Sequence, residues 1–151
     1  MVIRQFKQED NQGVKDLIIS VLTKEFPFDK KAYSDSDLNC VKSVYGGSRE
    51  TFYVVEDKGH IVGTVGVKED GKTTALMRRI FLDPAYRGKG IGTTLVDKVM
   101  EFCLENGYSH IVFRGTSRMV RAIDLCKKKG FTERERLDIG GINLHTLQLD
   151  I

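Results

Sequence analysis

The stretch LMRRIFLDPAYRGKGIG, residues 76–92, contains the features that decide the fold. An apolar segment ends at Asp83-Pro84, because proline has no N–H to donate to a neighbouring strand. Three glycines then fall within residues 87–92, directly before an amphipathic segment with helical spacing. Glycine destabilises regular structure by roughly 0.5–1 kcal/mol relative to alanine, so we expect this turn to require backbone without side chains.

A glycine-rich turn between a strand and a helix is typical of phosphate binding. The free N–H groups of the first helical turn and the helix dipole favour an anion there, and glycine allows close approach. The spacing differs from two common phosphate motifs, GxGxxG and GxxxxGK[ST], because each would need a glycine at Thr93. On these residues alone, a tight turn without a ligand is the alternative.

Hydrophobic periodicity predicts strands and helices that alternate along a single domain, residues 1–151. Predicted strands occupy residues 2–6, 51–56, 60–68, 73–82 and 109–115, followed by a last hairpin around Gly140-Gly141. Asp70-Gly71 predicts a two-residue hairpin loop between the third and fourth strands. Predicted helices occupy residues 11–23, 37–46, 91–106 and 119–129, with a loop around Pro27. The order predicts an α/β layered sheet that is mostly antiparallel at its start.

The composition is that of a globular protein with no metal or membrane signature. The chain has 151 residues, 40% hydrophobic and 30% charged, with a formal charge of 24 − 21 = +3. The three cysteines, Cys40, Cys103 and Cys126, have no metal-ligand spacing, which predicts a reducing compartment and no metal site. There is no apolar run of signal-peptide or membrane-span length, so we expect a cytoplasmic protein. Basic residues do not alternate with aromatic ones, so we expect no nucleic-acid binding.

Residues 76–108 resemble the acetyl-CoA segment of the GNAT superfamily of acyltransferases. The superfamily pattern Arg/Gln-x-x-Gly-x-Gly/Ala matches Arg87, Gly90 and Gly92. The later RAIDLCKKKGF resembles the pattern A-x-x-L-Y-x-K-x-G-F, with Cys126 in place of tyrosine. The resemblance covers nearly the whole chain. It implies a mixed, mostly antiparallel sheet of about seven strands with about four helices, in which strands four and five splay apart.

The resemblance also implies that acetyl-CoA is the co-substrate and that its pyrophosphate binds the glycine turn. Arg87 and Lys89 add positive charge, and Lys128 either reaches the adenosine phosphate or belongs to a solvated face. A backbone N–H near Ile80 is the implied oxyanion donor for the thioester carbonyl. The implied cofactor-binding residues are Ile80, Phe81, Leu82, Arg87, Gly88, Lys89, Gly90, Ile91, Gly92, Thr93 and Lys128.

The implied activity is N-acetylation of a primary amine of a small molecule, by direct attack of the amine on the thioester. A protein amine as acceptor and a non-catalytic acyl-CoA-binding module are the alternatives, and we expect a monomer or a homodimer. The sequence departs from the family in its catalytic groups. Leu76 stands where many relatives have a carboxylate base.

Other groups are candidates for the two proton transfers. As bases we consider Glu25, Asp29, Asp35 and Asp37, which are alternatively helix caps or surface charges; their acidity points to a cationic acceptor. Cys126 is a candidate general acid, since a thiol has a reference pKa of about 8.5, or else a small buried packing residue. Water and another tyrosine are further candidates for the acid.

Overall fold

The computed structural model describes the backbone of residues 1–151 and the side chains of all of these except residues 30 and 31. Seven strands form one sheet in the order β1-β2-β3-β4-β5-β7-β6. All neighbouring strands are antiparallel except β4 and β5, which are parallel, so the predicted mixed sheet is confirmed. The strands are β1 (Val2–Gln5), β2 (Thr51–Asp57), β3 (His60–Glu69), β4 (Thr74–Leu82), β5 (His110–Thr116), β6 (Thr132–Ile139) and β7 (Ile142–Asp150).

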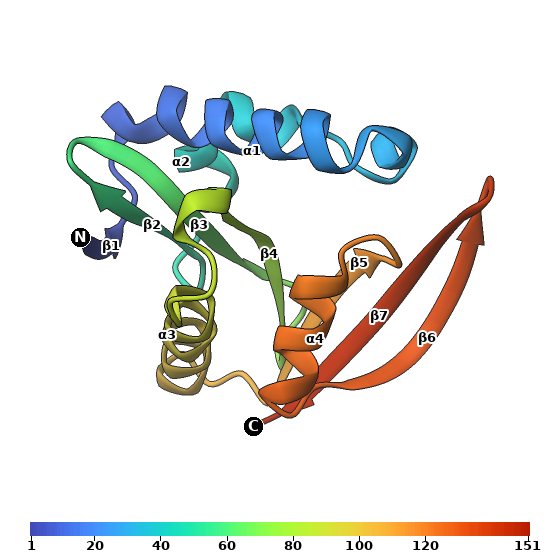
Figure 1. Cartoon of the computed structure of the whole chain (residues 1–151). Helices are drawn as coiled ribbons and strands as arrows, with labels where there is room; N and C mark the ends of the chain where they lie inside the picture. The colour runs from blue at the N-terminus through green and yellow to red at the C-terminus, as the bar shows by residue number, and fades with distance from the viewer.

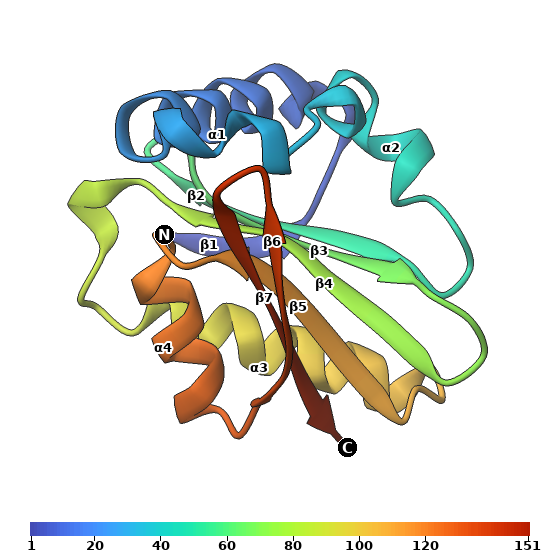
Figure 2. The ribbon, with the colours of Figure 1, turned by 90° about the vertical axis from the view of Figure 1, so that its right-hand side faces the viewer.

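Four α-helices cover the two faces of the sheet, as predicted. Helices α1 and α2 lie on one face, and α3 and α4 lie on the other (Figures 1 and 2). Their bounds are α1 (Asn11–Glu25), α2 (Val41–Val44), α3 (Ile91–Glu105) and α4 (Val120–Lys128). The segment predicted as one helix over residues 37–46 is instead a short 3-10 turn, Ser36–Asn39, followed by α2. A further 3-10 segment, Pro27–Ala32, lies in the predicted loop.

The connection between β3 and β4 is longer than predicted. Glu69 pairs with Ala75, and the Asp70 N–H donates to the Thr74 carbonyl at 2.9 Å. The two-residue loop predicted from Asp70-Gly71 is therefore wrong. A distant residue shapes this loop, because the Arg49 guanidinium donates to the carbonyl of Lys72 at 2.8 Å.

Strand β4 contains a β-bulge at Arg79. Val65 of β3 faces two residues of β4, Arg79 and Ile80. The φ angle of Arg79 is +56°, in the left-handed region, which costs roughly 1–2 kcal/mol for a residue with a side chain. The Thr64 hydroxyl donates to the Arg79 carbonyl at 2.7 Å and so helps to hold this conformation.

The bulge reverses the alternation of side chains along β4. Before it, Ala75 and Met77 pack in the core on the α3 side of the sheet. After it, Ile80 and Leu82 pack on that side, while Phe81 joins the core under α1. The end of β4 therefore presents a different set of residues to each face than an unbroken strand would.

A buried ion pair anchors the bulge to the other side of the fold. The Arg79 guanidinium donates to both oxygens of Asp37, with distances of 3.0 and 2.6 Å, and also to the carbonyl of Ser34. The Tyr45 hydroxyl donates to the same carboxylate at 2.8 Å. Burial opposes the ionisation of Asp37, but the hydrogen bonds and charge of Arg79 outweigh it and lower the pKa of Asp37.

Replacing Asp37 with alanine should strongly destabilise the protein. Asp37→Ala leaves the buried Arg79 charge without its partner, which typically costs about 3–5 kcal/mol of unfolding free energy at pH 7. The matched control Asp35→Ala should cost little, because Asp35 is exposed and its side chain caps no helix. Urea titration of the three proteins measures both effects.

The ion pair between Arg79 and Asp37 also determines how the stability of the protein changes with pH. Since the pKa of Asp37 is lowered from its ordinary value near 3.8, the pair stabilises the fold above that pH and is lost as the pH falls through the lower, folded value. The stability difference between wild type and Asp37→Ala should therefore be constant from pH 8 to 5 and shrink below about pH 4. A difference that persists undiminished at pH 3 would contradict this account.

Candidate active site

Strands β4 and β5 separate soon after they meet. They are paired only where Thr74–Leu76 lies beside His110–Val112. Further along, β5 pairs with β7 up to Thr116 and β4 pairs with β3 up to Leu82, so the two parallel strands diverge (Figure 1). The predicted splaying is confirmed. Beyond the paired region, the β4 backbone has no strand partner on this side, and its groups are available to a ligand.

A cavity of about 620 Å³ lies along this opening, between the end of α1, the end of β4, the glycine turn and α4. It collects all but one of the predicted cofactor-binding residues. Lys89 is the exception, because its ammonium group lies over the Tyr86 ring, 5.4 Å from the centroid. The predicted residues that line the cavity are Ile80, Phe81, Leu82, Arg87, Gly88, Gly90, Ile91, Gly92, Thr93 and Lys128.

The structure requires glycine in this turn for two different reasons. Gly88 and Gly90 have φ angles of +77° and +80°, and a Cβ added at either would meet nothing within 4 Å. Their left-handed backbone thus borders open space. Gly92 lies inside the first turn of α3, where a Cβ would come within 3.0 Å of the Leu125 side chain, so its missing side chain also lets α3 and α4 pack closely.

The start of α3 has free N–H groups. Its first intrahelical bond runs from Thr94 N to the Gly90 carbonyl at 3.1 Å, and no side chain caps the helix at Gly90. The N–H groups of Ile91, Gly92 and Thr93 therefore have no helical partner. Together with the positive end of the helix dipole, they form an anion-binding position at the mouth of the cavity.

Arg87 is held in place beside this position by Glu25, the last residue of α1. Its guanidinium donates to both Glu25 oxygens at 2.7 and 2.8 Å, and to the Leu82 carbonyl at 3.0 Å. Glu25 lines the first cavity. The base role of Glu25 stays a prediction, and this geometry adds a second role, the orientation of Arg87.

The other acidic residues of this region have partners of their own. Asp29 is fully buried and accepts hydrogen bonds from the Thr116 hydroxyl at 2.6 Å and from Arg118 at 2.8 Å. Asp37 pairs with Arg79, as described above. Asp35 is exposed. Because the two buried carboxylates are neutralised locally, the acidity of this segment does not indicate a cationic acceptor.

A second cavity, of about 310 Å³, lies between β4 and β5 beside residues 32–34. It shares three lining residues with the first: Ile80, Phe81 and Met119. The two cavities therefore meet at the β4 bulge. Leu76 lines the second cavity, so an apolar side chain occupies the position at which the resemblance implies a carboxylate base.

Tyr33 lines the second cavity and places its hydroxyl against Met119, one of the residues that the two cavities share. It donates to Met119 Sδ at 3.1 Å and accepts a hydrogen bond from the Thr116 N–H at 3.1 Å. Burial raises the pKa of Tyr33, so the phenol is protonated at neutral pH. Sequence analysis did not single out Tyr33, because it lies in a loop without periodicity or motif.

The comparison with protein families agrees with this geometry. Residues 16–131 match the model of the acetyltransferase (GNAT) family, well over half of the chain. The chain belongs to the GNAT acetyltransferase family. Among the residues that the structure describes, no helix of this chain is both long enough and apolar enough to cross a bilayer. Nor do three or more His, Cys, Asp or Glu side chains there converge as metal ligands would.

Individual GNAT relatives match different shares of the chain. N-acetylaspartate synthetase of Xenopus tropicalis is 37% identical over 81 residues, which are 53% of this chain and only 30% of that protein. The uncharacterized N-acetyltransferase YjgM of Escherichia coli is 29% identical over 136 residues, 86% of this chain and 81% of YjgM. The structure of yncA from Salmonella typhimurium with its cofactor acetyl-CoA has a TM-score of 0.78 and 21% identity, covering 99% of this chain and 93% of yncA.

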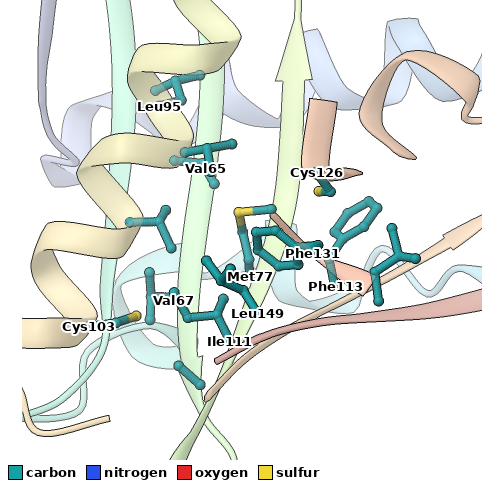
Figure 3. Close-up of a cluster of buried hydrophobic side chains, with 14 of the residues drawn as sticks. Val65, Val67, Met77, Leu95, Cys103, Ile111, Phe113, Cys126, Phe131 and Leu149 are labelled. Carbon is teal, nitrogen blue, oxygen red and sulfur yellow. The ribbon is translucent and has the colours of Figure 1, made fainter. Parts of the chain in front are cut away.

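Cys126, which replaces the tyrosine of the GNAT pattern, is fully buried. It lies in the core on the α3 side near Phe113 and Phe131 (Figure 3) and lines neither cavity. Burial raises the pKa of its thiol to about 12. This placement favours the packing role over the general-acid role.

Restoring the tyrosine of the GNAT pattern should disrupt packing. Cys126→Tyr forces a ring into a filled core, which typically costs about 1–3 kcal/mol of unfolding free energy. Cys40→Tyr is the matched control and should be near neutral, because Cys40 is exposed. Thermal and urea unfolding report the difference. Wild-type stability with raised kcat in Cys126→Tyr would instead show that the space for a catalytic ring exists.

Proposed function

We propose that this protein transfers an acetyl group from acetyl-CoA to a primary amine of a small molecule. The observation that supports this best is the junction of the two cavities. The anion-binding turn opens the first cavity, which runs along the free edge of β4 and meets the second at Ile80 and Phe81. A thioester bound in the first cavity would thus be accessible to an amine entering through the second.

The residues at the glycine turn fit the pyrophosphate of acetyl-CoA. Gly88 and Gly90 leave open space beside their backbone, and the first N–H groups of α3 are free to donate to phosphate oxygens. Arg87, Arg121 and Lys128 line the same cavity and supply positive charge. The fold shared with yncA, which holds acetyl-CoA, supports this choice of co-substrate.

The β4 bulge is suited to binding the thioester end of acetyl-CoA. When bound, acetyl-CoA supplies an activated carbonyl whose oxygen becomes negative as the amine attacks. In our proposal, the backbone N–H of Ile80, next to the left-handed Arg79, donates to that oxygen. Because the bulge holds this backbone in place before substrate binds, little reorganisation is needed during the reaction.

Two protons must move as the C–N bond forms and the C–S bond breaks. The Tyr33 hydroxyl, at the junction, is our candidate donor to the leaving sulfur. Among its described lining residues, the second cavity contains no carboxylate and no histidine, and both oxygens of Glu25 in the first cavity accept hydrogen bonds from Arg87. In our proposal, solvent therefore takes the proton of the attacking nitrogen, in place of the base role predicted for Glu25. The amine must then arrive neutral, and kcat/KM should rise with pH as the free amine loses its proton.

The size of the second cavity favours a small acceptor over a protein amine. Its volume of about 310 Å³ is at the lower end of the range typical of small-molecule sites. Release of free thiol from acetyl-CoA, measured across a panel of small amines, tests the transfer directly. Thiol release that occurs only with protein or peptide amines would favour a protein amine as the acceptor.

Filling the space at Gly90 should weaken CoA binding selectively. Gly90→Ala puts a methyl group beside the proposed phosphate position, and we expect the Kd of CoA in titration calorimetry to rise at least about tenfold, some 1.4 kcal/mol. Gly71→Ala is the matched control, since Gly71 has a φ angle of +91° and equally open surroundings. Both variants should lose similar stability, roughly 1–2 kcal/mol, because each strains a left-handed residue. Equal CoA affinity in the two would argue against the site.

Removing one hydroxyl tests the proton donor. Tyr33→Phe should lower kcat by about 10²-fold, the lower end for general acid catalysis, and leave the KM of acetyl-CoA nearly unchanged. The control Tyr53→Phe alters a half-buried tyrosine of β2 that lines neither cavity and should keep wild-type kcat. A kcat within threefold of wild type in Tyr33→Phe would assign the donor to solvent.

A further inference from the structure

The second cavity contains more positive charge than its surroundings neutralise. Three arginines line it: Arg78, Arg79 and Arg114. Arg79 is paired with Asp37, as described above. None of the described lining residues is an aspartate or a glutamate. Three cations and the one carboxylate of Asp37 leave a local charge of about +2 by direct count.

Arg78, which is half-buried, and Arg114, which is exposed, occupy corresponding positions on the two strands that border the opening between β4 and β5. Leu76 and Val112 are the last paired residues of the two parallel strands. Arg78 and Arg114 each follow two residues later, before the bulge, so their side chains leave the sheet on the same face. The strands diverge at this level, and the space between them is the second cavity.

Both arginines are free of ion pairs within the described part of the chain, whereas most other arginines are not. Carboxylates pair with Arg4, Arg49, Arg87, Arg118, Arg134 and Arg136. Arg78 is half-buried, and its charge also helps to lower the pKa of Asp37, but the hydrogen bonds of Asp37 go to Arg79 and Tyr45. A half-buried guanidinium without a hydrogen-bonded partner favours an anion as ligand.

We propose that Arg78 and Arg114 bind a carboxylate of the acceptor, so that the amine substrate is a small amino acid or a related amino carboxylate. This inference rests on the proposed acetyl transfer and names its substrate class. The planar guanidinium fork matches a carboxylate in a bidentate arrangement. Arg78 lies two residues before Ile80, so a carboxylate held at Arg78 leaves the amine of a small molecule within reach of the junction.

In this proposal, the phosphates of the co-substrate and the carboxylate of the acceptor bind in different cavities. The phosphates of the co-substrate belong to the glycine turn and α3, on the far side of the junction from Arg78 and Arg114. Ser34 and Tyr33 add hydroxyl groups to the second cavity, which suit the polar end of an amino acid. The volume of about 310 Å³ restricts the acceptor to a small molecule, and we therefore choose a free amino acid over an acidic peptide.

The test compares each amino acid with its own carboxamide. Thiol release from acetyl-CoA is measured with the twenty L-amino acids, their carboxamides, and dipeptides that begin with Asp or Glu. We expect at least one free acid to exceed its carboxamide about tenfold or more in kcat/KM. Arg78→Gln and Arg114→Gln should each reduce that ratio toward one by raising the KM of the acid. The matched control Arg134→Gln, on the exposed strand β6, should keep the wild-type ratio.

The outcomes separate the inference from the proposed function. Equal turnover of acids and carboxamides, or a ratio that both glutamine variants retain, would overturn carboxylate recognition and leave acetyl transfer intact. Turnover confined to the dipeptides would overturn the choice of a free amino acid. If no amine releases thiol although CoA raises the Tm, acetyl transfer fails, and calorimetry of the amino acids with CoA-loaded protein decides the inference. Heat of binding lost in the Arg78→Gln, Arg114→Gln double variant would support it, and no heat in the wild type would refute it.

Discussion

The ion pair between Arg79 and Asp37 is the interaction on which the proposed site depends. Arg79 adopts an unfavourable left-handed conformation, and such a residue persists only where its surroundings hold it firmly. The carboxylate of Asp37 and the carbonyl of Ser34 do so from the segment that connects α1 to α2. The pair therefore fixes two things together: the bulge that redirects Ile80 and Phe81 toward the junction, and the loop that forms one wall of the second cavity.

Some cations around the opening pair with carboxylates near the end of α1, and others have no such partner. Three ion pairs, Asp29 with Arg118, Asp37 with Arg79 and Glu25 with Arg87, join the end of α1 or the segment after it to residues that border the opening. These pairs fasten the α1 side of the molecule to β4, to the glycine turn and to the start of α4. Because their carboxylates are used in this way, the cations that have no such partner determine the electrostatic character of the second cavity.

The fold was largely predictable from the sequence, whereas the acceptor side of the site was not. The glycine turn and the segments around it depend on local backbone conformation, which short motifs record. The bulge also leaves a local trace, since unbroken alternation through Ala75 and Met77 would put Arg79 in the core, and a shift of one residue places Ile80 and Leu82 there instead. The partner of Arg79, Asp37, is 42 residues away in the short 3-10 turn Ser36–Asn39, so no local pattern identifies the pair. The same holds for Tyr33, whose hydroxyl meets Met119 across 86 residues.

Cys126 and Tyr33 show that a hydroxyl for proton transfer can come from a different element of the fold than the GNAT pattern implies. The GNAT pattern has a tyrosine on the helix that is α4 here, but Cys126 points into a core that Phe113 and Phe131 help to fill. Tyr33 approaches the start of that helix from the opposite face of the sheet and contacts Met119, the residue directly before α4. A hydroxyl therefore lies beside the junction although α4 has none to offer at position 126. In the mechanism we propose, the loop after α1 supplies both the proton donor and, through Asp37, the anchor of the oxyanion donor, so that acetyl transfer requires this loop to be folded against β4.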